Sequence, residues 1–71
     1  MKYLQANPRI ASGELTIKGT RIRIASVLEM LAAGMTLQYI SKQRYPWLPA
    51  GTLRGALKEA SEHLQTQPNH A

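Results

Sequence analysis

Cations are the side chains best suited to chemistry in this chain, since nine Lys and Arg stand against four Asp and Glu, for a formal net charge of +5. That balance is the electrostatic footprint of a nucleic-acid binder, although many small basic proteins bind no nucleic acid. On one predicted helix Arg54 and Lys58 stand four residues apart, and Lys42 and Arg44 end the helix before it. We expect these four cations and Thr52 to contact DNA. For Lys42 and Arg44, a solvated helix end is an equally good interpretation.

Two glycines, Gly51 and Gly55, share the side of the predicted helix that carries Arg54 and Lys58. A glycine inside a helix costs roughly 1 kcal/mol relative to alanine. We therefore expect close approach to this face by the DNA backbone, by a helix of a second copy or by a helix of a partner protein. The alternative is that a short helix tolerates weak positions.

Catalytic chemistry has little support in the sequence. Glu59 and Glu62 lie one turn apart on a single predicted helix, and His63 and His70 lie near or in the C-terminal tail. The chain has no cysteine, which excludes a disulfide framework, cysteine-ligated zinc and thiol catalysis. We expect no enzyme activity, no catalytic residues, no metal site and no cofactor.

The elements that must position the cations begin with a hairpin. Apolar residues alternate in segments 15–17 and 22–24, with Gly19-Thr20 as the turn, and this alternation predicts two half-buried strands. The hairpin is expected to span residues 8–24. Its polar face would carry Thr16, Lys18, Arg21 and Arg23.

Three helices are predicted after the hairpin, because the apolar period changes to that of a helix. Gly34 is expected to end the first helix, and Thr36 is expected to cap the second, which ends before Pro46. The third begins at residue 49 or 50. The predicted buried stripes are Ile24, Val27, Leu28 and Leu31 in the first helix, and Leu53, Ala56, Leu57, Ala60 and Leu64 in the third.

Together these elements predict a mainly α fold, with an N-terminal β-hairpin followed by a three-helix helix-turn-helix (winged-helix-like) domain. One domain would cover residues 1–65, and residues 66–71 would form a disordered tail. The third helix would read DNA. No apolar stretch approaches the roughly 18 residues that a membrane span requires, and residues 1–9 lack the apolar core of a secretory signal, so we expect a cytoplasmic protein.

A further set of residues is expected to contact a partner or to serve the fold: Arg21, Arg23, Tyr45 and Trp47. The guanidinium of Arg21 suits a DNA phosphate or an acidic groove, but we favour a structural ion pair with Glu59 or Glu62. The aromatic rings of Tyr45 and Trp47 are expected to close the small core rather than to stack on bases.

Several short motifs resemble the small bacterial family catalogued as domain of unknown function 433: Gly19-Thr20-Arg21-Ile22, Leu31-Ala32-Ala33-Gly34 and Tyr45-Pro46. Many members of that family are regarded as antitoxin-like partners of PIN-domain ribonuclease toxins. The resemblance marks Gly19-Thr20-Arg21 as a signature of the fold. This chain departs from the family pattern at Leu15 and Pro49, and segment 37–39 replaces an acidic pair, which makes this chain more basic.

We therefore expect a DNA-binding antitoxin that neutralises a co-encoded PIN-domain toxin and represses its own promoter. The resemblance implies the toxin, whereas basicity and helix order indicate DNA. A homodimer is expected, because a core this small supplies about 3 to 5 kcal/mol and a two-stranded hairpin has open edges. Two alternatives stay open: a protein-interaction module that covers a toxin without binding DNA, and a stand-alone transcription regulator.

Overall fold

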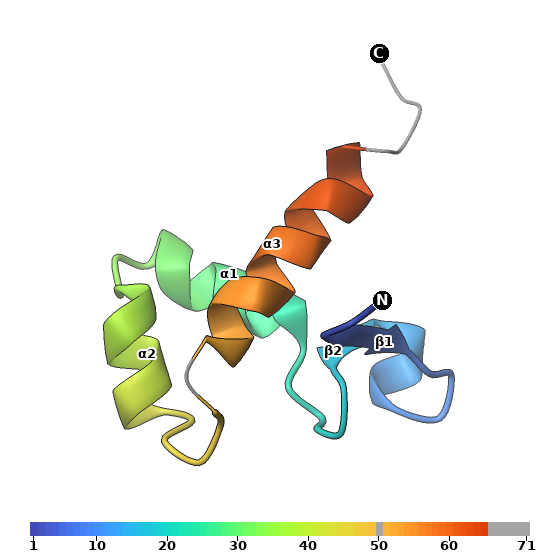
Figure 1. Ribbon diagram of the computed structural model, residues 1–71, viewed down its shortest axis with the longest axis horizontal. Helices are drawn as coiled ribbons and strands as arrows, with labels where there is room; N and C mark the ends of the chain where they lie inside the picture. Colours follow the sequence, from blue (N-terminus) through green and yellow to red (C-terminus); the bar gives the residue numbers. More distant parts are fainter. Residues whose placement is uncertain (50, 66–71) are drawn as a thin grey trace.

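The computed structural model describes residues 1–49 and 51–65 of the chain. A two-stranded antiparallel sheet at the N-terminus is followed by three helices (Figure 1), which confirms the predicted mainly α fold. The tail expected at 66–71 lies outside the described residues. In order, the elements are β1 (Leu4–Ala6), the 3-10 helix η1 (Ala11–Gly13), β2 (Leu15–Ile17), α1 (Ile24–Ala32), α2 (Leu37–Gln43) and α3 (Thr52–Gln65).

The strand that pairs with β2 is not the predicted one. β2 pairs with β1, with Leu4 opposite Ile17, whereas segment 22–24 contributes a single bridge between Thr16 and Arg23. The predicted strand at 22–24 is wrong because Ile24 already begins α1 and is buried in the core. The hairpin therefore starts earlier than residue 8.

The predicted turn between β2 and α1 is present. Gly19 has a φ of +78°, a conformation that residues with a β-carbon rarely adopt, and the Ile17 N–H donates to the Ile22 carbonyl at 3.0 Å. Thr16, expected on the polar face, is instead fully buried. Because Ile17 is buried too and successive side chains point to opposite faces, β2 is covered on both faces.

Local capping fixes the C-terminal end of α1 and the N-terminal end of α2, as predicted. Gly34, with a φ of +100°, ends α1 in a Schellman motif, since its N–H donates to Leu31 and the Met35 N–H donates to Met30. The Thr36 side chain caps α2 by accepting from the Tyr39 N–H. Thr52 begins α3, two or three residues later than predicted.

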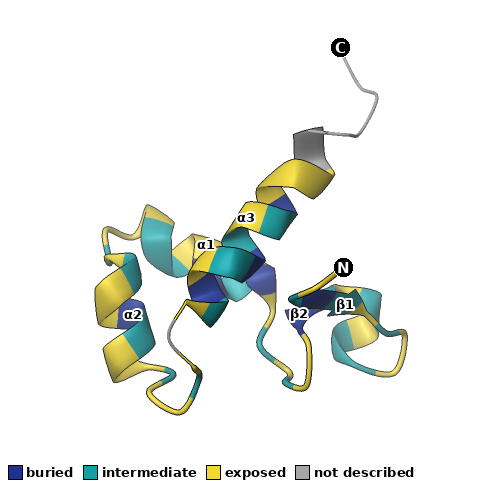
Figure 2. Ribbon diagram, viewed as in Figure 1, coloured by how far each residue is buried: buried dark blue, intermediate teal, exposed yellow. Residues whose placement is uncertain are grey.

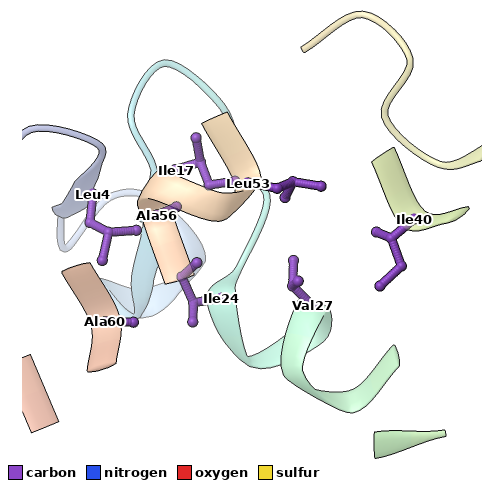
Figure 3. Close-up of a cluster of buried hydrophobic side chains, with 8 residues drawn as sticks. All are labelled: Leu4, Ile17, Ile24, Val27, Ile40, Leu53, Ala56 and Ala60. Carbon is purple, nitrogen blue, oxygen red and sulfur yellow. The ribbon is translucent and has the colours of Figure 1, made fainter. Parts of the chain in front are cut away.

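The core gathers around α3, which contacts β1, α1 and α2. Figure 3 shows side chains from both strands and all three helices converging on one cluster, and Figure 2 shows that most of α2 is not buried. The buried residue of α2 is Ile40. Leu28, predicted to be buried, is 46% exposed. Leu57 is half-buried, and the side chain of Leu64 lies outside the described residues. The buried apolar residues are Leu4, Ile17, Ile24, Val27, Ile40, Leu53, Ala56 and Ala60.

Within residues 1–49 and 51–65, none of the helices combines the length and the apolar character that crossing a membrane requires.

Candidate nucleic-acid interface

The packing of α2 against α3 leaves a surface hollow with a volume of about 270 Å³, which we name the basic hollow. Lys42, in the last turn of α2, and Arg54, in the first turn of α3, both line it. The fold thus brings together cations from two separate segments of the chain. The other lining residues are Leu37, Gln38, Ser41, Gly51 and Leu53, with no carboxylate among them.

The remaining predicted DNA contacts lie on the same two helices. Arg44 is the C-cap residue of α2 and is exposed, and Lys58 is exposed one turn beyond Arg54 on α3. Thr52 is the first residue of α3 and is half-buried. The exposed face of α3 therefore carries two cations at a spacing of four residues, which places them on one side of the helix.

The cations of this surface are not neutralised by the described part of the chain. Among the Lys and Arg side chains of residues 1–49 and 51–65, Arg23 alone forms an ion pair, which joins its Nη1 to Oε2 of Glu14 at 3.7 Å. Both side chains are about half exposed, so the pair adds little stability. The described structure leaves the cations of α2 and α3 available to an external anion.

Two loops lie on the same side of the molecule. The loop from β2 to α1 and the loop from α2 to α3 both lie at the bottom of Figure 1, below the N-terminal end of α3. Exposed basic or aromatic side chains occur in both loops, namely Lys18, Arg21, Arg44 and Trp47. The loop from α2 to α3 joins the two helices that line the basic hollow, so its side chains extend this candidate surface for a polyanion.

The two glycines of the third helix have different explanations. Gly51 was predicted to lie inside the helix. It instead precedes α3 and has a φ of +86°. Gly55 is inside α3, and a β-carbon at this position would lie 2.5 Å from Cε2 of Tyr3. The close approach expected at Gly55 is thus made by the N-terminal segment of the same chain.

The ion pair predicted for Arg21 is wrong. No ion pair joins Arg21 to Glu59 or Glu62 in the described structure, and Arg21 is exposed. The carboxylate of Glu59 instead accepts hydrogen bonds from backbone N–H groups near the N-terminus.

The Gly19-Thr20-Arg21-Ile22 motif has a structural explanation at three of its four positions. Gly19 supplies the positive φ, and the Thr20 hydroxyl donates to the Ile17 carbonyl at 2.8 Å and accepts from the Ile22 N–H at 3.0 Å. The Ile22 carbonyl accepts a hydrogen bond from the Ile17 N–H of β2. The Arg21 side chain takes no part in these bonds, so the turn does not need its guanidinium.

The two aromatic residues of the loop between α2 and α3 have separate environments. Tyr45 is half-buried and packs against the core, as predicted. Trp47 is 62% exposed, so the prediction that it closes the core is wrong. The rings make an edge-to-face contact with centroids 6.2 Å apart. Tyr45 therefore attaches the loop to the core while Trp47 faces solvent.

Glu59 has a structural function that the sequence pattern did not indicate. Its carboxylate accepts hydrogen bonds from the backbone N–H groups of Lys2, Tyr3 and Leu4, at 2.7 to 3.1 Å. Desolvation alone would raise the pKa of the Glu59 carboxyl, but these bonds and the nearby N-terminal ammonium outweigh it, so the pKa is lowered. Glu59 thus ties β1 to α3.

Glu59→Gln is expected to lower the melting temperature at pH 7 by several degrees, because a neutral amide is a weaker acceptor for these N–H groups. In the native protein the lowered pKa means that the stabilisation is present above the ordinary Glu value of 4.5 and is lost as pH falls through the lower folded-state value. The melting temperature, measured by circular dichroism between pH 7 and pH 3, should therefore depend less on pH in Glu59→Gln than in the native protein. Glu62→Gln, one turn further along α3, is the matched control, and equal melts for both variants would contradict the assignment.

A second hollow, apolar in character, lies between α1, β2 and α3, with a volume of about 280 Å³. We name it the apolar hollow. The half-exposed Leu28 lines it, and sequence reasoning missed this surface because the helical period assigned Leu28 to the core. Its lining residues are Glu14, Leu15, Ile24, Ala25, Leu28, Ala60 and His63.

The chemistry available on these surfaces is anion binding and apolar contact. Among the described residues no group of three or more His, Asp or Glu side chains is placed to hold a metal ion.

Comparison with known proteins returned one family. The model of the family described as "Protein of unknown function (DUF433)" matches residues 4–60. Neither a curated protein nor a solved structure matches the chain.

Proposed function

Because the chain belongs to the DUF433 family, whose description assigns no activity, we propose its function from its surfaces: it is a cytoplasmic, DNA-binding antitoxin. In this proposal the chain binds duplex DNA at its own promoter and represses it. It also neutralises a PIN-domain ribonuclease toxin encoded beside it. DNA and toxin are bound on different faces.

The basic hollow is the observation that supports DNA binding most directly. Lys42 and Arg54 line it without any carboxylate, so a phosphate would gain charge-assisted hydrogen bonds without repulsion. In the proposed complex α3 enters the major groove, as recognition helices do. Lys42, Arg44, Arg54 and Lys58 bind phosphates, and Thr52 reaches a base edge.

The segment between α2 and α3 is longer than in a standard helix-turn-helix. Such a turn has three or four residues, whereas α2 ends at Gln43 and α3 begins at Thr52. The proposal therefore rests on the shared hollow and its charge rather than on an exact match to that motif.

The apolar hollow favours protein binding on the other face. Leu28 is nearly half exposed there, and a helix or loop of a toxin that covered it would bury apolar surface. A chain that only covers a toxin, without binding DNA, is the second candidate function. If the chain is a stand-alone regulator with no toxin, a second copy of the chain would cover this hollow.

A homodimer remains part of the proposal, although each sheet edge is already partly paired within the chain. The Leu4 N–H on one edge donates to Glu59, and the Ile17 N–H on the other donates to Ile22. The outward-facing N–H groups of Leu4 and Ile17 thus have partners within the chain, unlike those of an open edge. When no toxin is bound, the apolar hollow is the surface on which we expect two copies to meet.

The test is a fluorescence-anisotropy titration of a labelled duplex from upstream of the gene, repeated with a scrambled duplex and with the neighbouring gene product. Tighter binding of the upstream duplex, with a stoichiometry of two chains per operator, is expected. Absence of binding at 50 mM salt would contradict the DNA function. If the neighbouring product is then captured nevertheless, the second candidate function is correct.

A further inference from the structure

We propose that the indole of Trp47 contacts DNA: it packs against a deoxyribose and the adjoining base edge of a nucleotide whose phosphates are bound by neighbouring cations. The inference rests on the proposed DNA function and adds an apolar contact to it.

The exposure of Trp47 is the first observation that carries the proposal. At 62% exposed it is the most exposed of the large apolar side chains in the described structure. Among the described residues its ring contact is with Tyr45, whose ring stands nearly perpendicular to the indole with centroids 6.2 Å apart. An aromatic face left in water is a surface that gains free energy when a ligand covers it.

The ordered turn that contains Trp47 is the second observation. The Leu48 N–H donates to the Tyr45 carbonyl at 3.1 Å, which closes a turn over residues 45–48. Pro46 occupies its second position, where the fixed φ of proline is favourable, and Trp47 occupies the third. Since the turn is already ordered, little conformational entropy remains to be lost when Trp47 binds a ligand.

The neighbouring charge identifies the ligand. Trp47 lies in the loop that joins the two walls of the basic hollow, between Arg44 at the end of α2 and Thr52 at the start of α3. Neither the hollow nor segment 44–49 contains an acidic residue. An exposed ring in a loop that joins two cation-bearing helices suits a nucleic acid, which offers sugars and bases between its phosphates.

Substitution of Trp47 tests this directly. Trp47→Ala should weaken binding of the upstream duplex about tenfold, because the apolar surface of the ring is no longer buried against the nucleotide. The slope of log K against log salt should stay unchanged, because no charge is removed. Tyr39→Ala is the matched control, since Tyr39 is 51% exposed but lines a different hollow. Trp47→Phe should retain most of the affinity, and thermal melts of all three variants check that they fold.

Intrinsic fluorescence gives an independent measurement, because Trp47 is the only tryptophan in the chain. Titration with unlabelled duplex should quench its emission, with a midpoint equal to the Kd from anisotropy. Unchanged emission and unchanged Trp47→Ala affinity, in a protein that still binds DNA, would overturn the proposal and leave the DNA function intact. A change of emission with the neighbouring gene product but not with DNA would also overturn it.

Discussion

Ile40→Ala is expected to lower the free energy of unfolding by about 2 to 5 kcal/mol, the range for truncating a buried isoleucine. Ile40 has no exposed surface and is the one buried residue of α2. At about 0.05 to 0.15 kcal/mol per residue, a domain of this length has roughly 4 to 11 kcal/mol in total. The substitution therefore removes a large part of the stability, and urea unfolding followed by circular dichroism measures it.

The control for Ile40→Ala is Gln38→Ala, a substitution at an exposed position on the same helix. The urea midpoint of this variant should equal that of the native protein. Since α2 forms one wall of the basic hollow, DNA affinity should fall together with stability in the Ile40 variant. An unfolding midpoint of Ile40→Ala equal to that of the native protein would show that the Ile40 side chain does not hold α2 against the core.

The double substitution Arg54→Ala with Lys58→Ala is expected to have the largest effect on DNA binding. Each phosphate contact contributes about 0.9 to the slope of log K against log salt. Loss of two contacts should flatten the slope by about 1.8 and, at 0.15 M salt, weaken binding about thirtyfold. Anisotropy titrations between 50 and 300 mM salt give both values.

A matched double variant separates local contacts from overall charge. Lys2→Ala with Arg9→Ala removes the same charge from two exposed residues of the N-terminal segment, which lies away from α2 in Figure 1. The salt slope should stay native there. Equal flattening in the two double variants would mean that α3 is not the DNA surface.

The parts of the fold that depend on neighbouring residues were predictable from the sequence. Thr36 and Gly34 act within one turn of their own helices, so residue type and position were enough to identify a cap and a stop. The helical period similarly identified Leu53, Ala56 and Ala60 as buried.

The parts that depend on distant residues were not predictable. β1 has three residues, too few to show a period, and its stabilising partner Glu59 is more than fifty residues away. Opposite charge suggested that Glu59 pairs with Arg21, but backbone N–H groups take up this carboxylate instead. At the candidate site the sequence indicated the cations of α2 and α3, whereas the shared hollow and the exposure of Trp47 required the packed structure.

The bonds from Glu59 to the N-terminal segment also determine the order in which the protein can fold. They close a loop of 55 to 57 residues, and a two-stranded sheet without support is at best marginally stable in water. During synthesis β1 leaves the ribosome well before α3, so β1 has no lasting partner until α3 has followed. The first strand and the last helix of the described chain must therefore become structured in the same step.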